Sequence, residues 1–240
     1  MPHVVFIGAG PGSADLITVR GARLLSQAQV VLFDALTDPA LREHAPQARW
    51  VDVGKRGFGH ATGQAAINEM LVHEALTHER VVRLKGGDPS VLGRLEEELQ
   101  ALATHGIDCE VVPGVTAALA AAAHTRRPLT RRGHGRSVSL TTAMTQLGVL
   151  QATRTADTEV FYMAGRQLGA LADKLMQAGW PADAPALVVS RAGWPDALVS
   201  EHRVADLADA EPLHAGRPAV VTVGAGAGPS VATSPQDPAA

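Results

Sequence analysis

The stretch "KGGDP", Lys85 to Pro89, places two glycines, an aspartate and a proline side by side after an apolar run. Gly86 and Gly87 allow backbone conformations and close approaches that a Cβ would forbid, and Pro89 restricts its own φ and the residue before it. Such a rigid turn can present main-chain groups and the Asp88 carboxylate to a ligand. The alternative is a tight strand-to-helix connection in which Asp88 caps the helix that follows.

A second glycine-rich loop follows the first apolar run, in "FIGAGPGSADLIT". Gly8, Gly10 and an acidic residue at the end of the next strand, Asp34, are typical of a dinucleotide-binding unit. Ser13 stands where that motif has its third glycine, and Pro11 removes a backbone N–H from the loop that would hold pyrophosphate. Both residues argue against a nicotinamide cofactor. As a purely structural residue, Asp34 would cap a helix.

Basic residues gather at two places. The segment "HTRRPLTRRGHGR", His124 to Arg136, has five arginines in its last eleven residues, and a shorter stretch holds Lys55, Arg56 and His60. Because arginine binds carboxylates through two parallel hydrogen bonds, these segments suit a polyanionic ligand. A solvated basic loop or a subunit contact is the alternative. Without interleaved aromatic residues, the segments are poor binders of single-stranded nucleic acid.

Composition limits the classes of protein to consider. An apolar content of 46% over 240 residues suffices for the core of one large or two modest domains. A net charge of −3 gives no overall attraction to nucleic acid or anionic membranes. Cys109 is the only cysteine, which excludes an intramolecular disulfide and a cysteine-rich zinc site. No apolar run approaches the ~20 residues of a membrane span. We therefore expect a cytoplasmic protein.

The first half of the chain alternates short Val-rich runs with longer helical patterns. We predict strands at "HVVFIG", "VVLF", "RWVDV", "RVVRLK" and "CEVV", which start at His3, Val30, Arg49, Arg80 and Cys109. Helices are predicted over 13–27 and 64–77, the second capped by Thr62. A third follows Pro89, where apolar residues recur at helical spacing from Val91 to Leu102. This alternation predicts an α/β fold with a mostly parallel sheet and helices on both faces.

The second half has strands closer together. We predict them at 136–143, 158–164, 184–191, 197–207 and 217–224, with one helix over 166–177, which favours a mixed sheet. Pro113 and Gly114 mark a domain boundary. The prediction is an N-terminal α/β domain over 1–113 with a mostly parallel sheet, and a C-terminal α/β domain over 114–228 with a mixed one. Residues 229–240 have three prolines and no apolar periodicity, so a disordered tail is expected.

The motifs occur together in one order. "GAGPGS", "FDALTDP", "VGKRGFGHATGQAAIN", "RLKGGDPSVLGR" and "VVPGVTAALAAAA" follow or overlap the five predicted strands in turn, and "FYMA" comes later. This series resembles the tetrapyrrole (corrin/porphyrin) methylases over about residues 3–225, and is most similar to the members that C-methylate uroporphyrinogen III. The resemblance implies two α/β domains, a cofactor in the interdomain cleft, and a homodimer.

The resemblance also implies S-adenosylmethionine as cofactor, with S-adenosylhomocysteine as product. The positions that match the family's cofactor-binding residues are Pro11, Gly86, Gly87, Asp88, Val91, Thr116, Ala117, Met163 and Ala192. Their chemistry suits the role, since glycines let main-chain groups approach the ligand and Asp88 can accept hydrogen bonds from an ammonium or a hydroxyl. Met163 would offer an apolar, polarizable wall, or else would be an ordinary core residue.

Two further positions match the family's proton-transfer residues: Asp34 as acceptor and Lys55 as donor. Without the family, they would be a capping aspartate and a surface lysine. For the carboxylates of a tetrapyrrole we expect Arg56, His60, Arg131 and Arg132 to supply cations. Methyl transfer from a sulfonium needs no metal. The expected reaction turns uroporphyrinogen III into precorrin-2, toward sirohaem or cobalamin.

Departures from the family pattern fall mostly on the substrate side, such as Ala35 in place of an arginine. They leave two alternatives open, which are methylation of a later precorrin and a nucleotide-binding or regulatory protein that has lost turnover.

Overall fold

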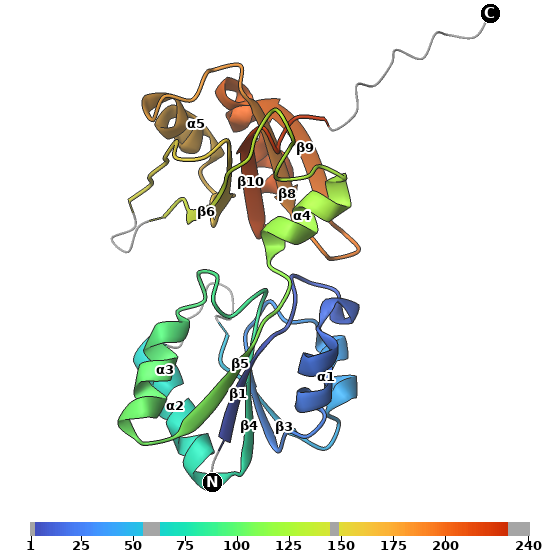
Figure 1. The fold of residues 1–240 in the computed structure, drawn as a ribbon, viewed down its shortest axis with the longest axis vertical. Helices are drawn as coiled ribbons and strands as arrows, with labels where there is room; N and C mark the ends of the chain where they lie inside the picture. The colour runs from blue at the N-terminus through green and yellow to red at the C-terminus, as the bar shows by residue number, and fades with distance from the viewer. Residues whose placement is uncertain (1–2, 55–62, 145–148, 230–240) are drawn as a thin grey trace, which may run out of the picture. The chain divides into compact units, whose positions relative to one another are not determined.

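The computed structural model describes residues 3–54, 63–144 and 149–229. It contains two compact units, Met1–Ala120 with Gly193–Pro195, and Ala121–Ala192 with Asp196–Ala240. Each unit has its own five-stranded sheet (Figure 1). The predicted fold class, α/β with a parallel first sheet and a mixed second sheet, is confirmed. All but the first residue of the predicted tail, 229–240, and the predicted cap Thr62 lie outside the described residues.

The first unit is built on a sheet of order β3-β2-β4-β1-β5 in which all neighbours are parallel. Its strands are β1 (His3–Gly8), β2 (Val30–Phe33), β3 (Arg49–Asp52), β4 (Arg80–Lys85) and β5 (Asp108–Val112). Its helices are α1 (Val19–Leu25), α2 (Gln64–Thr77) and α3 (Leu95–Thr104), with 3-10 turns η1 (Ala14–Leu16) and η2 (Pro39–His44). Figure 1 shows α1 on one face of the sheet and α2 and α3 on the other. All five predicted strands are present.

Both faces of this sheet are buried. Along β1, Val5 and Ile7 belong to one apolar cluster, whereas Val4 and Phe6 belong to the cluster on the opposite face. Side chains of a strand alternate between faces, so a strand covered on both sides needs an uninterrupted apolar run. This explains the Val-rich segments of the sequence.

Two predicted helices differ from the structure. The helix predicted over 13–27 is divided into η1 and α1, because Thr18 has an extended backbone and its side chain accepts a hydrogen bond from the Gly21 N–H as the cap of α1. The helix predicted to follow Pro89 begins only at Leu95, because Leu92 and Arg94 both have a φ of 54°, which no α-helix contains.

The second unit has a sheet of order β6-β7-β10-β8-β9, with β6 and β7 parallel and the other neighbours antiparallel. The strands are β6 (Val138–Thr142), β7 (Thr158–Tyr162), β8 (Pro185–Ser190), β9 (Leu198–Arg203) and β10 (Ala219–Gly224). The helical segments are α4 (Ala117–Thr125), which spans the division between the units, α5 (Leu168–Gln177), η3 (Val204–Ala210) and α6 (Glu211–His214). The strand predicted over 197–207 ends at Arg203. Val204, Leu207 and Ala210 are buried at every third position, which is the period of a 3-10 helix.

A buried histidine joins the end of α6 to the sheet of the second unit. His214 Nδ1 lies 2.9 Å from Ser190 Oγ, and its Nε2 lies 2.9 Å from Ser200 Oγ. Arg217 Nε donates to Ser190 Oγ at 3.1 Å. The Ser190 hydroxyl therefore contacts both Arg217 and the His214 ring, and each ring nitrogen of His214 has a serine hydroxyl beside it. Burial, followed by His202 and Arg217, lowers the pKa of His214.

This pKa shift predicts a loss of stability in mild acid. Below the ordinary histidine pKa of about 6.5, the unfolded chain binds a proton that buried His214 refuses, so the free energy of unfolding falls as the pH falls toward the lower folded pKa. The slope from this one site is at most about 1.4 kcal/mol per pH unit. Urea unfolding from pH 7.5 to pH 5 should show a shallower pH dependence for His214→Gln than for wild type. His124→Gln, at an exposed site, should behave as wild type.

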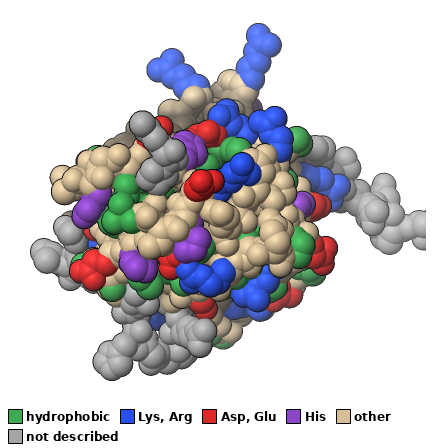
Figure 2. Space-filling view, turned by 90° about the horizontal axis from the view of Figure 1, so that it is seen from below, with side chains coloured by type: hydrophobic (Ala, Val, Ile, Leu, Met, Phe, Trp, Pro, Cys, Tyr) green, Lys and Arg blue, Asp and Glu red, His purple; other side chains and the backbone are tan. Residues whose placement is uncertain are grey.

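The face of the molecule seen in Figure 2 has acidic, basic and histidine side chains interspersed, without a broad field of one sign. No helix in the described ranges is long and apolar enough to cross a membrane.

Candidate cofactor and catalytic site

Two glycine-containing turns of the first unit pair with each other at the carboxyl ends of β1 and β4. The Gly10 N–H donates to the Gly87 carbonyl at 3.3 Å, and the Gly87 N–H donates to the Gly10 carbonyl at 2.7 Å. Gly10 has a φ of 82° and Gly87 a φ of 70°. L side chains rarely adopt such values, so both positions require glycine.

The turn after β5 packs directly against these two turns, backbone on backbone. A Cβ on Gly8 would lie 2.5 Å from the Cα of Gly114, and a Cβ on Gly114 would collide with the carbonyl oxygen of Gly87. Residues 8–12, 86–88 and 113–116 therefore form one surface, which we call the glycine shelf. It lies at the carboxyl ends of parallel strands, where ligands bind in open α/β sheets.

Asp88 joins two turns of the glycine shelf. Its Oδ1 accepts a hydrogen bond from the Ser90 N–H at 2.8 Å, and its Oδ2 accepts one from the Gly114 N–H at 2.9 Å. The carboxylate has further lone pairs and is only half-buried, so it can also accept a bond from a ligand. In the structure, Asp88 also holds Gly114 against the turn after β4. The sequence analysis did not predict this contact.

The sequence-predicted cofactor residues of the first unit lie on or beside the glycine shelf. They are Pro11, Gly86, Gly87, Asp88, Val91, Thr116 and Ala117. The short segment Gly193–Pro195 contacts the same loop: the Ser13 N–H donates to the Gly193 carbonyl at 2.7 Å, and the Trp194 indole packs against Gly12.

The other two predicted cofactor residues, Met163 and Ala192, belong to the second unit. They follow β7 and β8, which are both antiparallel to β10 between them and therefore end at the same edge of the sheet. Met163 is 57% exposed, so its interpretation as a core residue is wrong. Its φ of 59° costs about 1 to 2 kcal/mol for a residue with a Cβ. Strain at an exposed apolar side chain is typical of a binding site.

Asp34 directly follows β2 and forms an ion pair with Arg83, with 2.6 Å between Oδ1 and Nη2. Its Oδ2 makes no hydrogen bond among the described residues, and the side chain is 31% exposed. The cap of the next helical turn, η2, is Asp38, whose Oδ1 accepts from the Ala40 N–H. The interpretation of Asp34 as a helix cap is therefore wrong. The predicted Lys55, Arg56 and His60 lie outside the described residues.

The arginines of 126–136 divide into two groups. Arg127 is buried and pairs with Glu201, and the Arg131 guanidinium donates to the carbonyls of Gly228 and Pro229. These side chains hold the end of the second unit in place. Arg132 is exposed and, in the part of the chain that the structure describes, makes no ion pair. Residues 130–136 and Asp157 line a hollow of about 660 Å³, in which the remaining cations can meet an anionic ligand.

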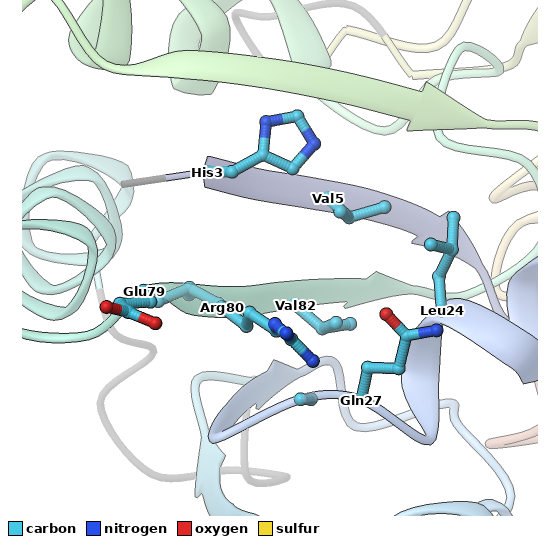
Figure 3. A pocket seen from close by; sticks show the side chains of 9 residues that line it. His3, Val5, Leu24, Gln27, Glu79, Arg80 and Val82 are labelled. Carbon is cyan, nitrogen blue, oxygen red and sulfur yellow. The ribbon is translucent and has the colours of Figure 1, made fainter. Parts of the chain in front are cut away.

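A smaller hollow lies at the opposite, amino-terminal ends of β1 and β4. It measures about 340 Å³, and Figure 3 shows Val5 and Val82 along its strands, with Glu79, Arg80 and Gln27 around it. Because it lies at the strand edge far from the glycine shelf, it is not part of the candidate site.

Sequence reasoning missed the charged side chains beneath Asp34. Arg83 and Lys85 are buried on β4, and both contact the fully buried Glu98 of α3. The signal was present in "RVVRLK", where Arg83 and Lys85 interrupt an apolar run two positions apart and therefore share one face of the strand.

Comparison with known proteins agrees with this geometry. The family model of the tetrapyrrole (corrin/porphyrin) methylases matches residues 3–208. The uroporphyrinogen-III C-methyltransferase of Pseudomonas aeruginosa is 42% identical over 193 residues, which cover 79% of each chain. The siroheme synthase of Psychrobacter cryohalolentis is 40% identical over 220 residues, which are 89% of this chain but 42% of that protein. The chain thus spans less than half the length of the siroheme synthases it matches.

Solved structures show the same fold. The uroporphyrin-III C-methyl transferase of Thermus thermophilus, complexed with S-adenyl homocysteine, has a TM-score of 0.81 and 35% identity, covering 92% of this chain and 97% of that one. A cobalt precorrin-4 methyltransferase has a TM-score of 0.82 and 31% identity, covering 95% and 96%. The two α/β units of this chain have the fold of these methyltransferases. The chain belongs to the family of tetrapyrrole (corrin/porphyrin) methylases.

Proposed function

We propose that this protein is an S-adenosylmethionine-dependent C-methyltransferase that converts uroporphyrinogen III to precorrin-2. The observation that carries the proposal is the glycine shelf, in a chain that is 42% identical to a uroporphyrinogen-III C-methyltransferase. The shelf packs three turns backbone on backbone, and a Cβ at Gly8 or Gly114 would collide with a neighbouring turn. Beside Gly86 and Gly87, by contrast, a Cβ would meet no described atom closer than 3.6 Å, so the main chain there can approach the amino-acid part of the cofactor.

The cofactor supplies an activated methyl group on a sulfonium. The task of the protein is to align the ring carbon of the substrate with that methyl group, which is an effect of proximity and orientation. In the proposal, the cofactor is held by Met163 and Ala192 together with the residues on or beside the shelf, which are Pro11, Gly86, Gly87, Asp88, Val91, Thr116 and Ala117. Asp34 accepts a proton at Oδ2, which makes no hydrogen bond to the described residues, and Lys55 donates one.

The carboxylates of the substrate require cations. We assign this role to Arg56, His60 and Arg132, with Arg131 contributing only through donors that its bonds to Gly228 and Pro229 leave free. The proposal includes a homodimer, supported by the family resemblance, and a cytoplasmic location, supported by the single cysteine. The domains proposed are 1–113 and 114–228.

The direct test incubates the purified chain with uroporphyrinogen III and S-adenosylmethionine without oxygen. We expect release of S-adenosylhomocysteine and a product heavier by whole methyl groups, counted by mass spectrometry. Methylation only of a later precorrin would replace this proposal with the first alternative. Tight S-adenosylhomocysteine binding without methylation of any precorrin would favour the non-catalytic alternative.

A further inference from the structure

A chain of four alternating charges runs from Asp34 into the interior of the first unit. Asp34 pairs with Arg83, Arg83 with Glu98, and Glu98 Oε2 with Lys85 Nζ at 2.7 Å. The Glu98 side chain is 0% exposed, and those of Arg83 and Lys85 are 2% and 4% exposed. Only Asp34, at one end, reaches solvent.

Arg83 in this chain cannot rotate without losing hydrogen bonds. Its Nε donates to Glu98 Oε1 at 3.0 Å, and its Nη2 lies 3.0 Å from the same oxygen while donating to Asp34 Oδ1 at 2.6 Å. Its Nη1 faces the carbonyls of Leu32 at 3.5 Å and Leu84 at 3.2 Å. The guanidinium thus donates four hydrogen bonds, and its Nη2 also lies within ion-pair distance of Glu98. The fixed guanidinium holds Oδ1 of Asp34, and no described residue hydrogen-bonds to Oδ2.

Stability alone is a weak reason for these buried charges. Arg83 and Lys85 are on the same face of β4 as Val81, which packs in an apolar cluster with Leu32 and Leu102. Replacing buried ion pairs by apolar residues of similar volume is often neutral or stabilising, because two charges must lose their water. A role in function therefore explains the buried carboxylate of Glu98 better than a role in stability does.

Glu98 links the two buried cations of this charge chain, Arg83 and Lys85. It is the only described acid in contact with both buried cations. Burial and the nearby charge of Arg83 lower the pKa of Lys85, and Glu98 opposes that shift. Without the carboxylate, two cations would face each other, and the Nε of Arg83 would lose its acceptor.

We propose that Glu98 is a positioning residue for Asp34. Through Arg83 it fixes Oδ1 of Asp34 and aims Oδ2 at the substrate proton, while Lys85 balances its charge. The inference rests on the proposed function, specifically on Asp34 as proton acceptor.

The test compares Glu98→Gln with Glu97→Gln, an exposed acid on the same helix that pairs with Arg94. Glu98→Gln should lower kcat about ten- to a hundredfold, because a misplaced catalytic group costs rate. KM and the affinity for S-adenosylhomocysteine should change less than about twofold, and Glu97→Gln should match wild type in all three. Arg83→Lys retains the charge but not the five-donor geometry, and should lower kcat similarly.

A double-mutant cycle separates positioning from general damage. If Glu98 acts through Asp34, adding Glu98→Gln to Asp34→Asn should reduce kcat by no more than about twofold further. Independent, multiplying losses would overturn the inference, as would unchanged kcat in both Glu98→Gln and Arg83→Lys. Full turnover by Asp34→Asn would overturn it together with the role of Asp34, whereas methylation by wild type would leave the proposed reaction intact.

Discussion

Asp34→Asn should lower kcat at least a hundredfold, because general acid–base catalysis contributes about 10²- to 10⁴-fold. The amide retains an oxygen that can accept the hydrogen bond from Arg83, whose Nη2 lies 2.6 Å from Oδ1 in the wild type. It has no basic oxygen at the position of Oδ2, so positioning is preserved while proton acceptance is lost. Release of S-adenosylhomocysteine measures turnover, and calorimetry should show cofactor affinity within about twofold of wild type.

Asp38→Asn is the matched control, since Asp38 lies in the same loop and caps η2. Asparagine is an equally good cap of η2 but cannot also accept from the Ala14 N–H, as Oδ2 of Asp38 does at 3.0 Å, so turnover should be retained while stability falls by about 1 kcal/mol. A loss of cofactor affinity in Asp34→Asn would contradict the proton-acceptor role and favour a carboxylate that binds a ribose. Titration with NADH followed by fluorescence checks that dinucleotide alternative independently.

Gly114→Ala should weaken S-adenosylhomocysteine binding at least tenfold, about 1.4 kcal/mol. The new Cβ would lie 2.7 Å from the Cα of Gly8 and would collide with the carbonyl of Gly87. All of these atoms are backbone, so no side chain can rotate away, and the turns must separate. Separation also strains the hydrogen bond from the Gly114 N–H to Asp88. Overpacking of this kind costs about 1 to 3 kcal/mol of stability.

Gly63→Ala serves as the control within the same unit. A Cβ there would meet no described atom within 4 Å, and its φ of −62° is allowed for every residue. Calorimetric affinity should equal that of wild type. Circular dichroism shows whether Gly114→Ala is folded. A folded Gly114→Ala with wild-type affinity would show that the glycine shelf does not bind the cofactor.

Much of the fold was predictable because parallel strands buried on both faces leave a plain signal. The segment "HVVFIG" became β1 over its full predicted length, His3–Gly8. The division of the helix predicted over 13–27 was not predictable from periodicity, since Leu16, Val19 and Leu24 recur at helical spacing across the break. Thr18 sets the start of α1 through one local hydrogen bond, which the spacing of apolar residues cannot predict.

The candidate site shows the same contrast. Glycine is the residue that most readily adopts a positive φ, so Gly10 and Gly87 indicate tight turns from the sequence alone. The sequence does not show which partner a long polar side chain will contact. In the sequence Arg131 is available for a substrate, but its guanidinium bonds to carbonyls almost a hundred residues away along the chain. Which partner a side chain reaches depends on tertiary packing.

The segment Gly193–Pro195 has a consequence for synthesis on the ribosome. It belongs to the first unit, where the Ser13 N–H bonds to the Gly193 carbonyl and Trp194 packs on Gly12, yet it is translated after most of the second unit. Domains usually fold in the order of their synthesis, from the N-terminus. Here the loop that contains Gly12 stays incomplete in the nascent chain until Trp194 has left the exit tunnel. A fragment that ends at Ala120 would carry the whole parallel sheet but expose this loop.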